Sequence, residues 1–332
     1  MHAASRRSRV PRNPGVGVIN IMEVYMNQLG YACINMTLSD VPKSKRITTN
    51  RSMIKRTFIK EGLKKASDLA LQNVLDLEKI LKWNEQRDIR FYRMSSDIFP
   101  WASEYEYDTL PDISTIRRVL ARVGEYAVSN GHRLTFHPGP FCCLASPKQS
   151  VVEKTYKELN NHSRIFDMMG FFPSHYNKIN IHVGGTYGNK EATAKRFIEN
   201  FHKPGGLDEN TKKRFTLEND DKASMWSTKD IYEKIYHQTG IPIVFDYHHH
   251  RFCTGELTER EALELAASTW PEGIDPVVHV SESRAVEQGD PKIRPQAHSD
   301  FIKKPVNSYG QQHDIMLECK KKEKALLKLR DS

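Results

Sequence analysis

Residues 242–250, PIVFDYHHH, decide the fold, because a short apolar run ends directly in side chains that can bind a metal ion. Five other segments have the same form, with an apolar run followed at once by a histidine or a carboxylate. The polar residues of all six are His137, His182, Glu218, Asp246, His279 and Glu318. Such groups at the carboxyl ends of several parallel strands are typical of the active site of a TIM barrel.

Short apolar runs and helical patterns alternate along the rest of the chain. The runs predicted to be strands cover residues 29–35, 89–94, 134–137, 179–183, 215–217, 243–247, 277–280 and 315–317. The segments predicted to be helices cover residues 51–83, 113–129, 151–169, 191–201, 228–238 and 258–268. Because the runs lack polar alternation, they indicate a parallel sheet covered by helices, and we predict a single (β/α)8 TIM barrel. The alternative is a doubly wound open sheet, but residues 29–38 lack its usual glycine-rich phosphate turn.

The barrel is predicted to span residues 26–332, after a flexible basic arm formed by residues 1–25. This arm carries Arg6, Arg7, Arg9 and Arg12 among Ser, Pro and Gly, so it is predicted to be disordered. No apolar run approaches the roughly 20 residues that cross a bilayer, which excludes a membrane-spanning protein.

The cysteine pattern indicates a reducing compartment. The chain has five cysteines, an odd number, with no CxxC spacing and no secretory leader. Free thiols inside the cell are therefore expected, in the nucleus of a eukaryote or the cytoplasm of a bacterium or virus.

The net charge favours a polyanionic partner. Lys plus Arg number 50 and Asp plus Glu 41, giving a formal charge of +9, although the predicted site concentrates carboxylates. A basic surface around an acidic, metal-filled centre suits nucleic acid. A generally basic protein without such a partner remains the alternative on charge alone.

The mixture of ligands predicts a divalent metal centre. Glu218, Asp246 and Glu318 would repel one another in a partly dry cleft unless a cation lay among them. Imidazole and carboxylate together suit manganese or zinc, whereas magnesium and calcium prefer oxygen. A lone histidine at a strand end is more often structural, so the number of candidates carries the prediction. At least two cations about 4 Å apart, an arrangement suited to breaking a phosphodiester bond, are expected.

The histidine run leaves one ligand open. In a strand Asp246, His248 and His250 would share a face, whereas His249 joins Asp246 only if the strand has already ended. The alternation of side chains does not decide between them.

Seven segments resemble the ultraviolet damage endonuclease family. They are LGYACINMTL (29–38), FHPGPF (136–141), IHVGGTYG (181–188), LEND (217–220), FDYHHH (245–250), RPQAH (294–298) and MLECKKKE (316–323). They follow the family's order from about residue 28 to residue 324. The resemblance implies a TIM barrel with two or three metal ions, usually manganese, with zinc or magnesium as alternatives. It implies a monomeric enzyme that nicks double-stranded DNA immediately 5′ to cyclobutane dimers, 6-4 photoproducts and some abasic sites.

The resemblance also implies roles for individual residues. His137, His182 and Glu218 correspond to the ligands of one ion, and Glu218 is expected to bridge to the next. The expected ligands of that next ion are Glu218, Asp246, His279 and Glu318. The family pattern favours His249 as a further ligand and adds His298, so that the expected catalytic residues are Glu218, His249 and His298.

The chain departs from the family at three places. Some members have histidine at Asp97, which leaves its role as a ligand open. Others have a modified lysine at Val277, so we predict that a third metal site is weak or empty here. Pro140 and Phe141 replace a glutamine and an aromatic residue that fill the gap left by a displaced lesion. Phe141 can still stack on exposed bases, but Pro140 cannot supply amide hydrogen bonds.

The resemblance implies a pocket for displaced nucleotides. Tyr31 and Asn35 match positions that line it, with the ring stacking and the amide reading a base edge. A core aromatic is the alternative for Tyr31. Two other functions stay open for the chain: a metal-dependent sugar isomerase on a similar barrel, and a DNA-binding protein with structural metals.

Overall fold

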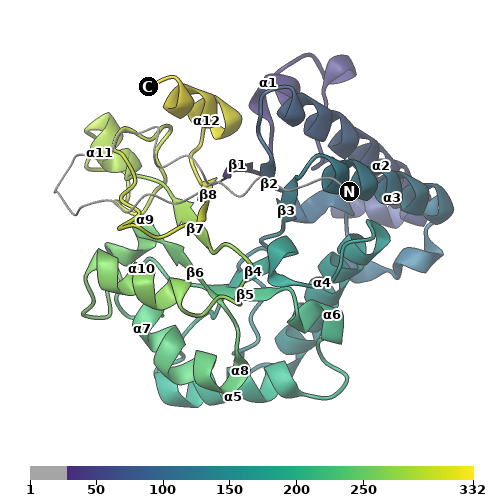
Figure 1. Cartoon of the computed structure of the whole chain (residues 1–332). Helices are drawn as coiled ribbons and strands as arrows, with labels where there is room; N and C mark the ends of the chain where they lie inside the picture. Colours follow the sequence, from purple (N-terminus) through teal and green to yellow (C-terminus); the bar gives the residue numbers. More distant parts are fainter. Residues whose placement is uncertain (1–27) are drawn as a thin grey trace, which may run out of the picture.

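The fold is that of a computed structural model, which describes residues 28–332. The basic arm predicted for residues 1–25 lies outside the described residues. Eight parallel strands form one sheet that curves into a barrel surrounded by helices (Figure 1). The strands are β1 Leu29–Ala32, β2 Phe91–Arg93, β3 Arg133–Thr135, β4 Ile179–His182, β5 Phe215–Glu218, β6 Ile243–Asp246, β7 Val277–Val280 and β8 Asp314–Leu317. The predicted (β/α)8 TIM barrel is confirmed.

The barrel closes through a narrow seam between β3 and β4. The strand order is β3-β2-β1-β8-β7-β6-β5-β4, and a single parallel bridge from Phe136 to Ile179 joins the two ends. Two backbone hydrogen bonds make this bridge. Phe136 N donates to Lys178 O at 2.9 Å, and Asn180 N donates to Phe136 O at 3.0 Å. Each of the other seven neighbouring pairs is joined as a regular parallel ladder.

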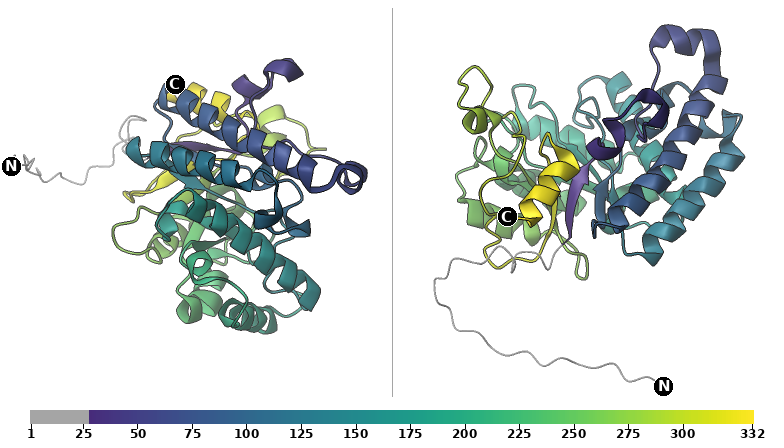
Figure 2. Two further views of the ribbon diagram at one scale, coloured as in Figure 1. Left: turned by 90° about the vertical axis from the view of Figure 1, so that its right-hand side faces the viewer. Right: turned by 90° about the horizontal axis from the view of Figure 1, so that it is seen from above.

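Helices cover the outer face of the barrel, with α2, α3 and α4 stacked in sequence (Figure 2). The main helices are α2 Lys55–Glu85, α3 Ile113–Ser129, α4 Gln149–Met168, α5 Lys190–His202, α10 Glu259–Ala267 and α12 Lys322–Arg330. Shorter helices are α1 Met36–Ser39, α6 Glu209–Lys212, α7 Thr228–Ile231, α8 His237–Thr239, α9 Tyr247–His250 and α11 Arg284–Gln288. Within residues 28–332 no helix has the length and apolarity required to span a membrane.

The first long helix begins later than predicted, at Lys55 instead of residue 51. Arg51 holds the preceding segment extended, because its guanidinium contacts Asp76 at 2.6 Å and donates to Thr48 O at 2.6 Å. Helix α2 is also kinked at Gly62, whose φ of 60° is a conformation that glycine adopts readily. The α3 boundaries agree with the sequence prediction.

An apolar plug fills the barrel interior beneath the predicted site. The plug comprises Ala32, Phe91, Val244, Trp270, Val277 and Met316. Val244, Val277 and Met316 each precede a predicted ligand by two residues, so both members of each pair face inward. Val277 therefore supplies only a buried isopropyl group below His279.

Gly124 sets the approach of α3 to the end of α4. A Cβ at this position would lie 1.8 Å from the carbonyl oxygen of Met169, a backbone atom that cannot rotate away. Replacing Gly124 with Ala is expected to lower the free energy of unfolding by about 2–3 kcal/mol, despite a helix-propensity gain of about 1 kcal/mol. Urea denaturation measures this change. The exposed Ala121 of the same helix is the control, because Ala121→Gly costs only about 1 kcal/mol. A Gly124→Ala protein as stable as the wild type would refute the close contact.

Candidate metal centre

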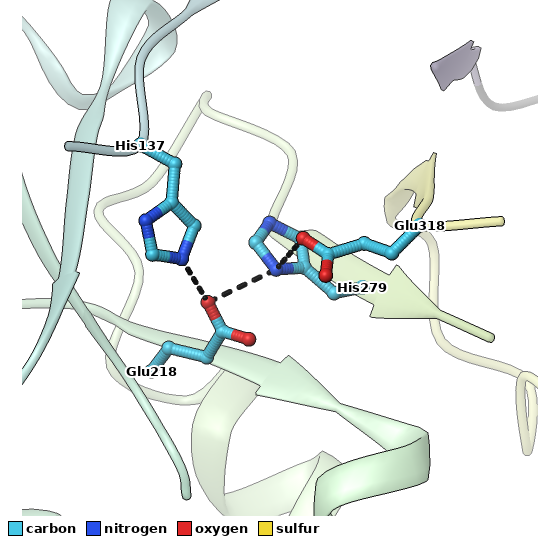
Figure 3. A group of neighbouring side chains, drawn as sticks. All are labelled: His137, Glu218, His279 and Glu318. Atoms are coloured by element: carbon cyan, nitrogen blue, oxygen red, sulfur yellow. Dashed lines mark hydrogen bonds and ion pairs between the residues drawn. The ribbon is translucent and has the colours of Figure 1, made fainter. Parts of the chain in front are cut away.

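Four of the eight predicted ligands meet at the carboxyl rim of the barrel (Figure 3). The group contains His137, Glu218, His279 and Glu318, whose candidate ligand atoms lie within 4.8 Å of one another. Glu218 Oε2 lies 2.9 Å from His137 Nε2 and 3.0 Å from His279 Nδ1. His279 Nδ1 is also 3.2 Å from Glu318 Oε1. Strands β5 and β7 and the residues just after the ends of β3 and β8 therefore deliver their side chains to one point.

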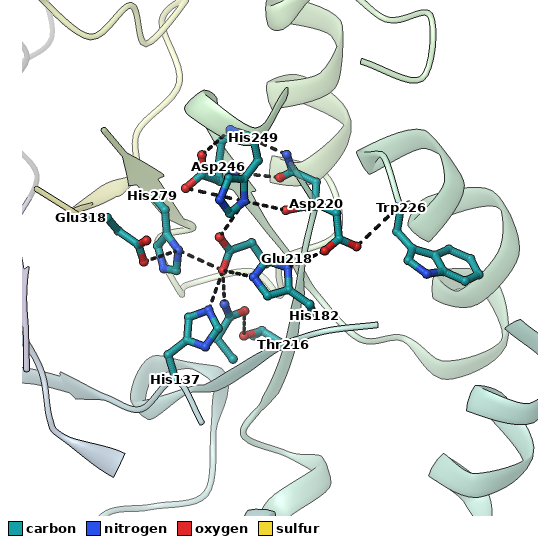
Figure 4. Close-up of polar contacts among 12 residues, drawn as sticks. His137, His182, Thr216, Glu218, Asp220, Trp226, Asp246, His249, His279 and Glu318 are labelled. Atoms are coloured by element: carbon teal, nitrogen blue, oxygen red, sulfur yellow. Dashed lines mark hydrogen bonds and ion pairs between the residues drawn. The ribbon is translucent and has the colours of Figure 1, made fainter. Parts of the chain in front are cut away.

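A second group shares Glu218 (Figure 4). It contains His182, Glu218 and His249, again with candidate ligand atoms within 4.8 Å. His249 Nδ1 lies 3.4 Å from Glu218 Oε1, and His182 Nε2 lies 4.0 Å from Glu218 Oε2. This division differs from the expected one, because His137 lies with His279 and Glu318 while His182 lies with His249.

The end of β6 explains why His249 faces the site. The strand stops at Asp246, and residues Tyr247–His250 form the helical turn α9. Asp246 caps this turn, because its Oδ1 accepts a hydrogen bond from His249 N at 2.7 Å. Positions three apart on a helix lie on the same side, which brings the side chain of His249 toward Asp246. The prediction that residue 247 continues the strand is thus wrong, and the end of the strand removes the ambiguity over the histidine run.

Glu218 is completely buried yet ionised. Burial opposes ionisation, but the imidazoles of His279, His182 and His137 lower the pKa of Glu218 well below its usual range. Burial lowers the pKa of His279 to about 4, so His279 acts on the carboxylate as an N–H donor and not as a cation. Asn180 Nδ2 donates a further hydrogen bond to Glu218 Oε2 at 2.5 Å.

Two histidines of the second group carry positive charge in the metal-free protein. Burial alone would lower the pKa of His182, but Glu218 and Asp220 outweigh it and raise the pKa to about 10. Burial likewise opposes the charge on His249, whereas Asp246 and Glu218 raise its pKa to about 9. Burial raises the pKa of Asp246 itself to about 7. In the second group, the protons on His182 and His249 therefore offset the negative charge of the neighbouring carboxylates, and a bound metal ion would replace these protons.

Glu318 and His298 lie on the β8 side of the centre. Arg93 from β2 forms an ion pair with Glu318 across the barrel. His298, from the loop between β7 and β8, has its Nδ1 2.8 Å from Ser281 Oγ and 3.9 Å from Glu318 Oε2. It belongs to neither ligand group of the described residues.

The donor atoms fit a divalent cation. Glu218 Oε1 and Asp246 Oδ2 are buried oxygens with no hydrogen-bond partner among the described residues, and His279 Nε2 is a buried nitrogen in the same condition. Buried polar atoms are normally satisfied, so such a set needs a ligand. Mixed imidazole and carboxylate donors match manganese or zinc.

Several residues of the centre were missed by the sequence analysis. Asn180 donates to Glu218, and Asp220 Oδ1 lies 3.3 Å from His182 Nδ1. Asn219 Oδ1 accepts from Asp246 N at 2.8 Å, and its carbonyl oxygen lies 2.9 Å from His249 Nδ1. A signal existed for two of them. Asn180 stands two residues before His182, and Asp220 two residues after Glu218, so each shares the inward face of its strand.

Tyr31 and Asn35 are buried in this structure. Tyr31 Oη donates to Asn84 Oδ1 at 2.7 Å and receives a hydrogen bond from Asn35 Nδ2 at 2.9 Å. Neither side chain presents a free surface to a base, because both are at most 1% exposed. Contact with a displaced nucleotide stays a prediction, and it would require both residues to leave these hydrogen bonds.

The loop after His137 carries the predicted wedge. Phe141 is 90% exposed, the largest exposure of any large hydrophobic side chain among residues 28–332, and Pro140 beside it is also exposed. An exposed aromatic ring near the mouth of the barrel is available for stacking. Asp97 is exposed as well and lies in neither ligand group.

Lys178 is buried below the centre. It precedes Asn180 and His182 by two and four residues, so it faces the barrel interior, and its Nζ has no hydrogen-bond partner among the described residues. Burial lowers the pKa of Lys178 to about 7, although Glu218 acts in the opposite direction. Burial of the amine therefore outweighs its attraction to the carboxylates.

Replacing Lys178 with Met is expected to raise the free energy of unfolding of the metal-free protein by about 1–4 kcal/mol at pH 7. The unfolded lysine binds its proton below about pH 10.5, whereas the folded one binds it only below about pH 7. The contribution of Lys178 to the stability of the wild type therefore falls as pH drops from 10.5 to 7, and the advantage of Met grows over that window. Denaturation in chelator at pH 7 and pH 9.5 measures this, with the exposed Lys213→Met as control. A less stable Met variant would contradict it.

Comparison with known proteins identifies the family. Residues 27–332 match the family UV-endonuclease UvdE. The chain belongs to this family. The UV-damage endonuclease of Schizosaccharomyces pombe is 34% identical over 320 residues, which are 92% of this chain and 50% of that protein. The UV DNA damage endonuclease of Bacillus cereus is 34% identical over 315 residues, which are 92% of this chain and 93% of that protein. The chain thus spans about half of the fungal relative and nearly all of the bacterial one.

Solved structures agree with this family membership. The crystal structure of SacUVDE superposes with a TM-score of 0.77 at 31% identity, covering 92% of this chain and 97% of that chain. A D-tagatose 3-epimerase-like protein superposes with a TM-score of 0.50 at 11% identity, covering 73% of this chain and 86% of that chain. The second likeness concerns the fold alone.

Proposed function

We propose that the chain is a metal-dependent DNA repair endonuclease that nicks the backbone immediately 5′ to ultraviolet photoproducts, with abasic sites as further substrates. The observation that carries this proposal is the shared Glu218, which belongs to two ligand groups at the rim of a barrel of the UvdE family. Relatives named UV-damage endonuclease from a fungus and a bacterium support the substrate class. We further propose that the protein acts as a monomer, in the nucleus of a eukaryote or the cytoplasm of a bacterium or virus.

His137, Glu218, His279 and Glu318 would hold one cation, and His182, Glu218 and His249 another, with Asp246 Oδ2 available beside His249. A divalent metal, manganese in our proposal, supplies positive charge that stabilises the negative charge developing on the phosphodiester oxygens. Val277 offers no donor, so we propose two tightly held ions and a weak or empty third site. Elemental analysis that found three tightly held ions per chain would overturn this part.

His298 is suited to proton transfer at the edge of the site. Its Nδ1 is hydrogen-bonded to Ser281 Oγ, which leaves Nε2 as the nitrogen that can exchange a proton with DNA or water. Burial lowers the pKa of His298, so the ring is neutral and able to accept a proton at neutral pH. Glu218 and His249 complete the proposed catalytic set, because as ligands they would hold the metal ions in place around the scissile phosphate.

The damaged nucleotides are proposed to leave the duplex. Turning a nucleotide out costs a few kcal/mol, and least where a lesion already weakens stacking. The exposed Phe141 would stack in the gap, an interaction worth roughly 1–3 kcal/mol. Tyr31 and Asn35 would read the displaced bases after the rearrangement described above.

One experiment tests the proposal against its rivals. The protein and manganese are incubated with an end-labelled duplex carrying one cyclobutane dimer, beside the same duplex without the lesion. A nick directly 5′ to the dimer, absent from the undamaged duplex, is the expected result. Binding of the lesion without a nick would favour a DNA-binding protein with structural metals. Turnover of a ketose with neither binding nor nicking would favour a sugar isomerase.

A further inference from the structure

A cationic cleft lies beside the metal centre and outside both ligand groups. It has a volume of about 710 Å³ and lies between the β1–α2 connection and the segment after β8. Its basic lining residues are Lys43, Arg46, Arg51, Lys65, Lys320 and Lys322. Both walls follow the carboxyl ends of strands, and Lys320 stands two residues beyond Glu318. The cleft therefore opens on the rim that carries the centre.

The positive charge of the chain concentrates in the segment that supplies one wall of this cleft, where Lys43, Arg46, Arg51 and Lys65 line it. Residues 41–67 contain nine lysines and arginines and a single carboxylate, Glu61. The surplus of eight positive charges in 27 residues compares with a formal charge of +9 for all 332. Such a local excess costs electrostatic self-repulsion unless an anionic partner lies against it.

Five of the six cations of the cleft form no ion pair among residues 28–332, and the sixth, Arg51, pairs with the buried Asp76. Among the described residues no ion pair involves Lys43, Arg46, Lys65, Lys320 or Lys322, and the one acidic lining residue, Asp40, contacts Lys324 at 3.3 Å instead. A second cleft at the rim, of about 580 Å³, differs in this respect. There Lys190 pairs with Asp230 at 2.7 Å and Lys229 with Glu256 at 3.5 Å. The lining of the second cleft also includes Arg251 and balances its cations with Asp230, Glu233 and Glu256, so of these two clefts only the first has an excess of positive charge.

The walls of the cleft are fixed by buried polar contacts. Asn73 Oδ1 accepts from Arg51 N at 3.1 Å, and its Nδ2 donates to Arg51 O at 3.1 Å. The buried carboxylate of Glu323 accepts hydrogen bonds from Met36 N at 2.8 Å and Thr37 N at 2.7 Å. Segments from both ends of the chain are thereby joined, so the cationic side chains project from a rigid frame.

We propose that this cleft binds the sugar-phosphate backbone of the duplex arm that leaves the metal centre on the β1–β8 side. The inference rests on the proposed endonuclease function and deepens it, because it assigns one flank of the substrate to one surface. Unpaired lysines and arginines on a fixed frame suit phosphates, and such contacts position a duplex without reading its sequence. The second rim cleft, whose lining has as many carboxylates as cations, makes no comparable contribution.

The test compares a cleft variant with a matched control. Lys43→Ala, Arg46→Ala and Lys65→Ala are combined in the full chain. The control combines three exposed lysines outside the cleft: Lys195→Ala, Lys203→Ala and Lys213→Ala. Both sets are placed in a Glu218→Gln background with manganese, so that a dimer-containing duplex is bound without being cut. Thermal unfolding checks that both fold.

The dissociation constant of the cleft variant is expected to rise by about tenfold or more near physiological salt. The slope of log affinity against log salt should shrink by roughly 0.9 for each lost phosphate contact, while the control keeps the wild-type slope. Shortening the duplex on one side of the lesion should weaken wild-type binding but leave the cleft variant unaffected, and shortening the other side should weaken both.

Two outcomes would overturn the inference. An unchanged dissociation constant and salt slope in the cleft variant would do so, as would equal losses in the cleft and control variants. Either result is compatible with lesion-specific nicking by the wild type, so the endonuclease function would stand while the cleft assignment fell. A wild type that neither binds nor nicks the damaged duplex would overturn both.

Discussion

Replacing Glu218 with Gln is expected to reduce nicking of a dimer-containing duplex by about a thousandfold or more. Glu218 belongs to both ligand groups, so the loss of its charge weakens two metal sites at once. Glutamine has nearly the same volume, and the barrel should remain folded. The measurements are single-turnover cleavage and the manganese content of the purified protein.

The matched control is Glu209→Gln on helix α6, an exposed carboxylate that belongs to neither ligand group and forms an ion pair with Lys212 at 2.9 Å. It should cleave at the wild-type rate. Cleavage retained by Glu218→Gln, with a normal metal content, would show that the shared carboxylate is misassigned.

Removal of divalent metal is expected to abolish nicking, and the affinity for manganese should increase with pH. In the metal-free protein His182 and His249 hold protons up to pKa values of about 10 and about 9, and imidazole binds a metal only in its neutral form. Each proton displaced contributes about a tenfold gain in apparent affinity per pH unit below these values. Calorimetric titration with manganese between pH 6.5 and 8.5 measures the trend.

The contribution of His182 and His249 to the stability of the metal-free protein should move in the opposite direction. Both histidines have folded pKa values above the ordinary 6.5, so their ion pairs stabilise the fold fully below pH 6.5. This contribution is lost as pH rises through about 9 for His249 and about 10 for His182. Asp220→Asn removes one partner of His182 and should flatten the dependence. A manganese affinity that did not vary with pH would contradict the proton-filled second group.

Much of the fold follows from the sequence because each strand is an apolar run that ends in a polar side chain. In β5 and β6 the apolar run indicates the strand. The polar residue at its end, Glu218 or Asp246, indicates where the strand reaches the mouth of the barrel. The predicted start of α2 was wrong because a long-range contact decides it: Arg51 forms an ion pair with Asp76, which lies about six turns into the helix itself. Local propensity carries no information on such a contact.

Six of the eight predicted ligands lie in the two ligand groups of residues 28–332, but their pairing was not predictable from the sequence. His137 shares Glu218 with His279 because the registers of β5, β7 and the β3–β4 bridge bring three distant segments together. The position of His249 had a local signal, since aspartate is a frequent helix cap and Asp246 could end its strand as one. The burial of Tyr31 depends on Asn84 at the far end of α2, a partner that spacing in the sequence does not reveal.

The join between β3 and β4 is the weakest of the eight joins between neighbouring strands, because a single bridge forms it. His137 follows one side of it and His182 ends the other, with ring centroids 5.4 Å apart. Widening of this join would move both imidazoles away from Glu218, whereas two ions that share Glu218, one held by His137 and the other by His182, would oppose the widening. Closure of the barrel at this join and binding of the metal ions should therefore stabilise each other.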